Sequence, residues 1–162
     1  MKGNSSKNIK AAITAVGGFV PNDFISNQDL EKVLDTTDEW ITTRTGIKKR
    51  RILKGQGKGT SYLAIKAAED VITKRNIDPD TIDLVIVATI TPDYKGAATA
   101  PSVASAIKAN NAYAFDLSAA CSGFLYGMST ATSYIESGRY KKVLLIGADK
   151  MSSVVDLSLI HI

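Results

Sequence analysis

The stretch Leu84-Val85-Ile86-Val87-Ala88 decides the fold class, because it places five apolar residues in a row. A short continuous apolar run of this kind, rich in β-branched residues, is typical of a strand that is covered on both faces. Two further apolar runs follow it along the chain, Ala112–Leu117 and Val143–Ala148. The sequence therefore predicts three buried strands.

Helical patterns lie between these strands. Leu63, Ala67 and Val71 recur at helical spacing and predict a helix over 60–75, which Asp78-Pro79-Asp80 separates from the first strand. A second helix is expected from Pro101 to Ala109, since proline suits the first helical position, and a third over Cys121–Glu136, stopped by Gly138.

Strands that alternate with helices through short links require right-handed crossovers. The predicted fold class is therefore α/β, a mostly parallel sheet with covering helices. Smaller elements are expected before residue 60. The first is a strand over Ile9–Val16, followed by a helix that Ser26 caps and that runs through Leu34. A second helix is opened by Thr36 and Glu39, which have capping-box spacing, and is ended by Gly46. A strand over Lys49–Leu53 and a loop over 55–59 follow.

Composition excludes several classes of protein. The chain has 162 residues, 44% of them apolar and 22% charged, which is typical of a globular domain. One cysteine cannot form an internal disulfide and favours a reducing, cytoplasmic location. The longest apolar run is five residues, whereas a membrane-spanning helix needs about 20. No metal-ligand spacing is present, and the glycine-rich loop over 55–59 lacks the strand-to-helix context of a dinucleotide site.

The positive charge is concentrated in one segment. Between Arg44 and Lys58 no acidic residue occurs, and seven of the 20 basic residues fall there. A solvated loop explains such a run, and so does a site for a phosphorylated small molecule or an acidic protein. Nucleic acid is the weaker alternative, because aromatic residues are not interleaved with these charges as a stacking surface needs.

Cys121 is the one residue whose position suggests covalent chemistry. It stands where a buried strand hands over to a helix, and sites in parallel sheets gather at the carboxyl ends of strands. At a helix N-terminus a thiol ionises more readily, and free N–H groups can receive the oxyanion of a tetrahedral intermediate. From position alone, an inert buried cysteine remains the commoner explanation.

Two motifs resemble a known family. The segment Asp116-Leu117-Ser118-Ala119-Ala120-Cys121-Ser122-Gly123-Phe124 resembles the nucleophile signature of 3-oxoacyl-[acyl-carrier-protein] synthase III, the initiating condensing enzymes of bacterial type II fatty acid synthesis in the thiolase-like superfamily. A second match lies upstream, in Thr37-Asp38-Glu39-Trp40-Ile41-Thr42-Thr43-Arg44-Thr45-Gly46-Ile47. The resemblance covers almost all of residues 9–156.

The resemblance implies a fold, a reaction and site residues. The fold would be the amino-terminal half of a thiolase-like αβαβα fold. Cys121 would take the acyl group of a short acyl-CoA, and the acyl-cysteine would then condense with malonyl-acyl carrier protein (ACP), with loss of carbon dioxide, to give 3-oxoacyl-ACP. Trp40 would stack on the adenine of CoA, with Arg44 on the other side and Thr36 nearby. No cofactor or metal is implied, and a homodimer is expected at full length.

The chain also departs from the family pattern. The family takes a catalytic histidine and asparagine from its second half, and His161, the one histidine here, matches neither. We therefore expect residues 1–156 to form a truncated thiolase-like half, followed by a non-family tail over 157–162. In a fragment, the apolar stripe between Phe124 and Ile135 would be exposed, so we expect the isolated chain to aggregate and to be inactive in condensation.

Two alternatives remain open at this point. One is another thiolase-like condensing enzyme, such as a hydroxymethylglutaryl-CoA synthase or a polyketide or quinolone starter enzyme. The other is a non-catalytic CoA-binding module in which Cys121 is structural.

Overall fold

A computed structural model of the chain describes residues 9–155. These residues form two compact units. The first unit consists of residues 9–19 and 60–149, and the second of residues 20–59 and 150–155. The cysteine belongs to the first unit, and the Trp40 segment belongs to the second.

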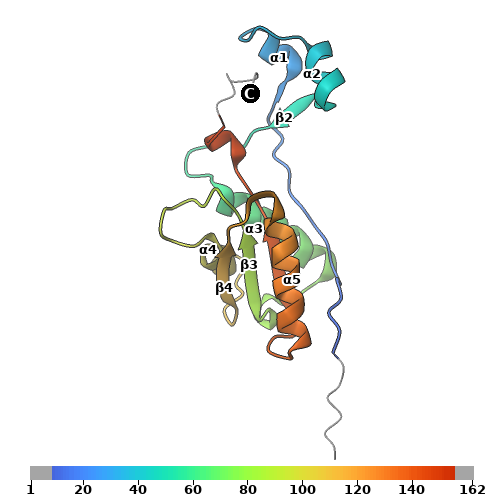
Figure 1. The fold of residues 1–162 in the computed structure, drawn as a ribbon. Coiled ribbons are helices and arrows are strands. Elements are labelled where there is room, and N and C mark those ends of the chain that lie inside the picture. Colours follow the sequence, from blue (N-terminus) through green and yellow to red (C-terminus); the bar gives the residue numbers. More distant parts are fainter. Residues whose placement is uncertain (1–8, 156–162) are drawn as a thin grey trace, which may run out of the picture. The chain divides into compact units, whose positions relative to one another are not determined.

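The first unit is built on a three-stranded parallel sheet (Figure 1). Strand β3 (Leu84–Ala88) is central, with β4 (Tyr113–Leu117) on one edge and β5 (Val143–Gly147) on the other. Both neighbours run parallel to β3, and Ile86 pairs with Phe115 and Leu145. All five residues of β3 are buried. The predicted α/β class and the three predicted strands are confirmed.

Helices cover both faces of this sheet. Helices α3 (Thr60–Arg75) and α4 (Thr99–Ala106) lie on one face, and α5 (Gly123–Glu136) lies on the other (Figure 1). The core on the α3–α4 side contains Val85, Val87 and Ile146 from the sheet. Successive strand residues point to opposite faces, so Ala88 lies on the α5 side, next to Gly123. A single-turn 3₁₀ helix, η1 (Pro79–Thr81), precedes β3 and begins within the break predicted over Asp78-Pro79-Asp80.

In the first unit, two helix starts were predicted wrongly. Helix α4 begins at Thr99 rather than Pro101, because the Asp116 carboxylate on β4 accepts the N–H groups of Thr99 and Ala100 and so caps the helix from a distant strand. Helix α5 begins at Gly123 rather than Cys121, because Ala120–Ser122 form a separate 3₁₀ turn, η2. By contrast, α3 has the predicted bounds, and Gly138, just beyond α5, adopts a positive φ of 75°.

The predicted strand over Ile9–Val16 is wrong: the structure has no strand there. A strand exists only where its backbone groups pair with a neighbour. Residues 9–19 are held to the rest of the first unit by other contacts: the Gly18 N–H donates to the Asp70 carboxylate, and Lys10 forms an exposed ion pair with Glu136.

The second unit contains a two-stranded antiparallel sheet and two short helices. Strand β1 (Phe24–Ser26) pairs with β2 (Lys49–Arg51), which is shorter than the predicted strand over Lys49–Leu53. Helix α1 (Asn27–Glu31) follows β1, and α2 (Asp38–Thr45) leads to Gly46, whose φ of 70° ends the helix as predicted. A 3₁₀ turn, η3 (Met151–Ser153), lies near the end of the described residues.

One of the two caps predicted for these helices is confirmed, and the other is wrong. Ser26 caps α1 as expected, with Asp29 completing the capping box, but α1 ends at Glu31 instead of Leu34. The capping box predicted for Thr36 and Glu39 is wrong. Thr37 is the N-cap of α2, with its hydroxyl accepting the Trp40 N–H at 3.0 Å. The Glu31 carboxylate also accepts the Asp38 N–H at the start of α2.

Candidate active site

Cys121 lies in the turn η2, directly beyond the carboxyl end of β4, and its side chain is exposed. The preceding residue, Ala120, has a φ of 45°, in the left-handed region that residues other than glycine rarely adopt. The N–H groups of Ser122 and Gly123 donate to the carbonyls of Ala119 and Ala120, which closes the turn. The thiol is thus presented to solvent by a tight, strained turn instead of by the first turn of α5.

Helix α5 holds this turn against the sheet. Its two buried residues, Gly123 and Gly127, face β3 and β5. A Cβ atom at Gly123 would lie 3.3 Å from the Ala88 Cβ, and one at Gly127 would lie 2.5 Å from Leu145 Cδ1. The lack of a side chain at these two glycines allows α5 to lie close to the sheet.

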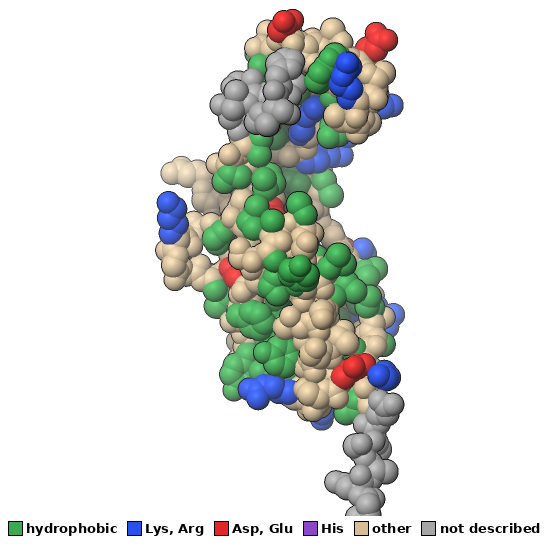
Figure 2. Space-filling model, in the orientation of Figure 1, with side chains coloured by type: hydrophobic (Ala, Val, Ile, Leu, Met, Phe, Trp, Pro, Cys, Tyr) green, Lys and Arg blue, Asp and Glu red, His purple; other side chains and the backbone are tan. Residues whose placement is uncertain are grey.

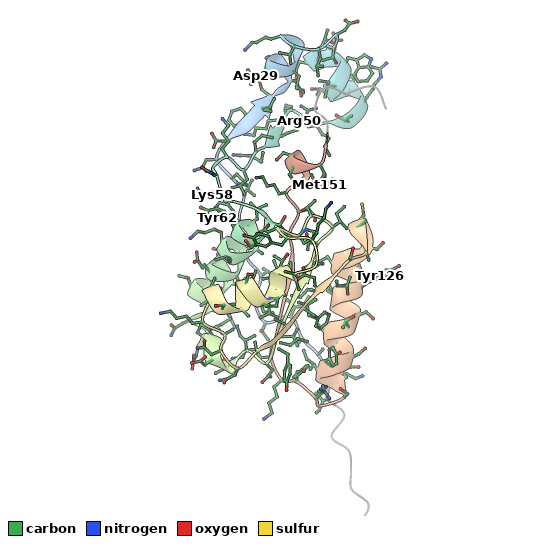
Figure 3. All side chains as sticks on the ribbon, turned by 90° about the vertical axis from the view of Figure 1, so that its left-hand side faces the viewer. Asp29, Arg50, Lys58, Tyr62, Tyr126 and Met151 are labelled. Carbon is green, nitrogen blue, oxygen red and sulfur yellow. The ribbon has the colours of Figure 1, made fainter. Side chains whose placement is uncertain are left out.

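The outer face of α5 is open. Phe124 is 46% exposed, Leu125 64% and Tyr126 58%. Figure 2 shows apolar side chains gathered over this helix, and Figure 3 labels Tyr126 on its outer side. Of the stripe predicted to be exposed in a fragment, Phe124 and Met128 are exposed, whereas Ala131 and Ile135 are half-buried. A face of this kind is covered by protein in a stable monomer or assembly.

Two carboxylates brace loops at the carboxyl ends of the strands, and sequence reasoning gave neither of them a role. Asp116, on β4, holds the start of α4. Asp149, two residues beyond β5, accepts the Ile90 N–H and the Thr89 hydroxyl, each at 2.8 Å. Acidic residues at or just after buried strands are the signal that identifies such braces, because their carboxylates can pair with unpaired N–H groups of neighbouring loops.

In the second unit the structure brings Trp40 and Arg44 together. They stand four residues apart on α2, and the Arg44 guanidinium carbon lies 4.4 Å from the centre of the Trp40 ring. To hold an aromatic ring between them, the indole and the guanidinium group must lie about 7 Å apart, which is twice the contact distance of about 3.5 Å. The observed separation leaves no room for a ring between the two groups, so Arg44 must swing away before one can stack there. We call Trp40 and Arg44 the platform.

Thr36 lies just before the α2 cap and is partly buried. Its hydroxyl oxygen is enclosed and has no hydrogen-bond partner in the part of the chain that the structure describes. A buried hydroxyl without a partner costs about 1–3 kcal/mol. A change in its χ1 angle that offers the hydroxyl to a ligand would remove that cost.

The structure divides the basic run into two kinds of residue. Arg50 points inward and donates to the Asn27 side chain. Lys49 and Arg51 are exposed on the other face of β2, with Lys49 Nζ 5.1 Å and Arg51 Cζ 5.9 Å from the centre of the Phe24 ring. The Lys49 ammonium is exposed, whereas the Arg51 guanidinium also donates to the carbonyls of Pro21 and Asn22.

No metal site or membrane span is found in the described part of the chain. Within residues 9–155, no group of three or more His, Cys, Asp or Glu side chains is arranged to hold a metal ion. None of the helices described there has the length and apolarity to cross a bilayer. His161 and the predicted tail over 157–162 lie outside the described residues.

Comparison with known proteins agrees with both motifs. The chain is 57% identical over 148 residues to the beta-ketoacyl-[acyl-carrier-protein] synthase III of Chlorobaculum tepidum, and 54% identical to a synthase III of Bacteroides thetaiotaomicron. The family model for 3-oxoacyl-[acyl-carrier-protein] synthase III matches residues 115–160, which include Cys121. The chain belongs to this family.

Solved structures place it in the same fold. The synthase III of Aquifex aeolicus superimposes with a TM-score of 0.85 at 48% identity, over 91% of this chain and 47% of that one. The priming beta-ketosynthase of the R1128 polyketide pathway gives 0.84 at 36% identity, over 89% of this chain and 43% of that one. The two curated relatives are matched over 91% of this chain and 45% and 44% of their own length. The chain thus spans about half of a synthase III.

Proposed function

We propose that this chain supplies the nucleophile-bearing, amino-terminal half of an initiating condensing enzyme. The Cys121 thiolate attacks the thioester carbonyl of a short acyl-CoA, the tetrahedral intermediate collapses, and CoA leaves as a thiolate. Malonyl-ACP then loses carbon dioxide, and the resulting carbanion attacks the acyl-cysteine. Collapse of that second intermediate frees the Cys121 thiolate and gives 3-oxoacyl-ACP.

The exposed thiol in the turn η2 is the observation that carries this proposal. Nucleophiles at the carboxyl edge of a parallel sheet are accessible to substrate, and backbone N–H groups there stabilise an oxyanion. The N–H groups of Ser122 and Gly123 already serve the turn. The two bonds that close the turn do not use the Cys121 N–H, so we assign one oxyanion contact to it.

The platform supports a role in CoA binding. The partly buried Trp40 indole has a broad π face on which adenine can stack once Arg44 moves, and a guanidinium group can stack and pair with phosphate. Base–aromatic stacking contributes about 1–3 kcal/mol per base. Trp40 therefore supplies most of the adenine contact in this proposal, Arg44 flanks it, and the enclosed Thr36 hydroxyl turns toward the nucleotide.

The rest of the reaction needs partners beyond the described residues. A second half supplies the histidine and asparagine of the decarboxylation step and covers the outer face of α5. The full-length protein works as a cytoplasmic homodimer without a cofactor, taking acyl-CoA and an acyl carrier protein as substrates. The 162-residue chain alone does not condense malonyl-ACP.

Intact-protein mass measurement tests the acylation step. A full-length protein that contains this chain is incubated with acetyl-CoA, with Cys121→Ala and Ser118→Ala compared in parallel. We expect an acetyl increment in the parent protein and in Ser118→Ala, and none in Cys121→Ala. Binding of CoA without an increment in the parent protein would instead support the non-catalytic module.

A second candidate is a priming enzyme of a polyketide pathway, which the 36% identity to the R1128 priming beta-ketosynthase favours. Both candidates acylate the same cysteine, so their starter groups must distinguish them. A competition among acetyl-, butyryl- and hexanoyl-CoA, followed by mass measurement of the acyl-enzyme, reports the preferred starter. Preference for acetyl-CoA supports the fatty acid enzyme, and exclusive use of a longer chain supports the alternative.

A further inference from the structure

Asn27 is a completely buried polar residue at the junction of β1 and α1. Burying an amide side chain is unfavourable unless its donors and acceptor are paired. Neither of the two family motifs includes this residue. The hydrogen-bond partners of the Asn27 amide therefore indicate its structural role.

The Asn27 amide links three segments of the second unit. Its nitrogen lies 2.6 Å from Asp38 Oδ1, at the start of α2, and 2.8 Å from the carbonyl oxygen of Ile47, just beyond the end of α2. Since the group has two hydrogens, these two acceptors take both. The Asn27 carbonyl oxygen accepts from the Arg50 guanidinium on β2.

Thr42 joins the same network. Its Oγ1 lies 3.2 Å from the Asn27 amide nitrogen, and its hydroxyl donates to Asp38 at 3.2 Å. Thr42 stands one turn after Asp38, on the same face of α2. The side chain of Asn27 therefore meets α2 at its start and in its second turn, and meets the chain again just past Gly46.

This arrangement determines which way the platform faces. Each helical residue turns by about 100°, so Trp40 lies about 200° around the axis from Asp38, and Arg44 lies about 200° from Thr42. The platform thus points away from the face that Asn27 holds. Loss of the Asn27 contacts frees α2 to rotate, and any rotation of α2 moves the indole and guanidinium groups together.

We propose that Asn27 is a positioning residue of the CoA site, which fixes the orientation of α2 and thereby aims the Trp40–Arg44 platform at the adenosine of acyl-CoA. The proposal rests on the function proposed above. It assigns to Asn27 no contact with substrate.

A pair of substrates isolates this role. Acetyl-pantetheine carries the same thioester as acetyl-CoA but lacks the nucleotide, so it cannot use the platform. In a full-length protein that contains this chain, we expect Asn27→Ala to raise KM for acetyl-CoA about tenfold and to leave kcat/KM for acetyl-pantetheine within about twofold. Equal losses with both substrates, or no loss with either, would overturn the proposal.

A milder variant keeps the test decisive if Asn27→Ala does not fold. Thr42→Val removes only the hydroxyl that faces Asn27 and Asp38. Its matched control is Thr43→Val, because the Thr43 hydroxyl donates only to carbonyls of its own helix, at Glu39 and Trp40. Thr42→Val should raise KM for acetyl-CoA selectively and Thr43→Val should not. Identical behaviour of the two variants would contradict the proposal.

The variant Trp40→Ala separates this proposal from the one on which it rests. If Trp40→Ala weakens acetyl-CoA selectively while Asn27→Ala and Thr42→Val do not, the platform stands and the positioning role fails. If Trp40→Ala affects both substrates alike, the platform itself is wrong, and the role of Asn27 falls with it.

Discussion

Gly127 of α5 and Leu145 of β5 fit together so closely that no side chain can be added at residue 127 without movement. A Cβ atom there would lie 2.5 Å from Leu145 Cδ1. The reverse fit occurs at the end of β5, where a Cβ at Gly147 would lie 3.1 Å from a ring carbon of Phe124. Gly127 of α5 thus makes room for Leu145 of β5, and Gly147 of β5 makes room for Phe124 of α5. This reciprocal packing sets the distance between α5 and the sheet.

Gly127→Ala is expected to destabilise the fold. Overpacking costs about 1–3 kcal/mol, and the better helix propensity of alanine offsets about 0.5–1 kcal/mol of it. Chemical denaturation of a full-length protein should show a lower midpoint. Gly18→Ala is the control, because a Cβ at Gly18 has no heavy atom within 4 Å. Equal midpoints for the two variants would show that Leu145 moves aside freely.

Asp29 should titrate at low pH. The Ser26 hydroxyl, then the Ser26 backbone N–H and Lys32, lower the pKa of its carboxyl from 3.8 to about 2. A depressed carboxyl pKa stabilises the fold above about pH 4, and this contribution disappears as the pH falls toward 2. Carbon-13 NMR of labelled aspartate can follow the titration. Ser26→Ala should raise the Asp29 pKa more than Lys32→Met does, and the reverse order would contradict this account.

The exposed part of the basic run should act in substrate binding, whereas Arg50 should act in stability. Replacing Lys48, Lys49 and Arg51 by glutamine is expected to raise KM for one of the two substrates and to reduce its salt dependence. Arg50→Gln should instead lower the denaturation midpoint, because it removes the partner of the buried Asn27 carbonyl oxygen. Unchanged KM and salt dependence for both substrates in the triple variant would rule out the binding role.

The isolated 162-residue chain should self-associate. The exposed Phe124, Leu125 and Tyr126 form an apolar surface on α5, and burial of such a surface favours association. Sedimentation velocity should show oligomers, and Leu125→Lys should increase the monomer fraction. Val33→Lys is the control, since Val33 is also exposed but lies in the other unit. A sharp, reversible thermal transition of a monomer would contradict the expectation.

Elements governed by local pattern could be predicted from the sequence. The continuous apolar run of β3 and the helical repeat of α3 appear at their predicted positions, because each pattern depends only on neighbours within the segment. The Ser26 cap and the Gly46 stop are local in the same sense. The start of α4 could not be predicted, since the Asp116 carboxylate of a later strand holds it. At α2 the cap is local, but the pattern did not separate Thr37 from the neighbouring Thr36.

The candidate site residues show the same difference between what a sequence pattern indicates and what distant contacts determine. Cys121, Trp40 and Arg44 were predicted from the resemblance of their two segments to a known family, and their roles stay predictions. The direct stacking of Arg44 on Trp40 and the buried amide of Asn27 depend on rotamers and on contacts across 11 to 23 positions of the chain. Period and composition carry no record of such contacts.

The left-handed backbone of Ala120 bears on how the sulfur is aimed. For an L-residue this conformation costs roughly 1–2 kcal/mol, and glycine would adopt it without that penalty. Glycine would also widen the range of backbone angles open to the turn, so the neighbouring thiol would sweep through more directions. With alanine at position 120, fewer backbone angles are open to the turn. The fold bears the conformational cost of this residue, and the direction of the Cys121 sulfur is set before a substrate binds.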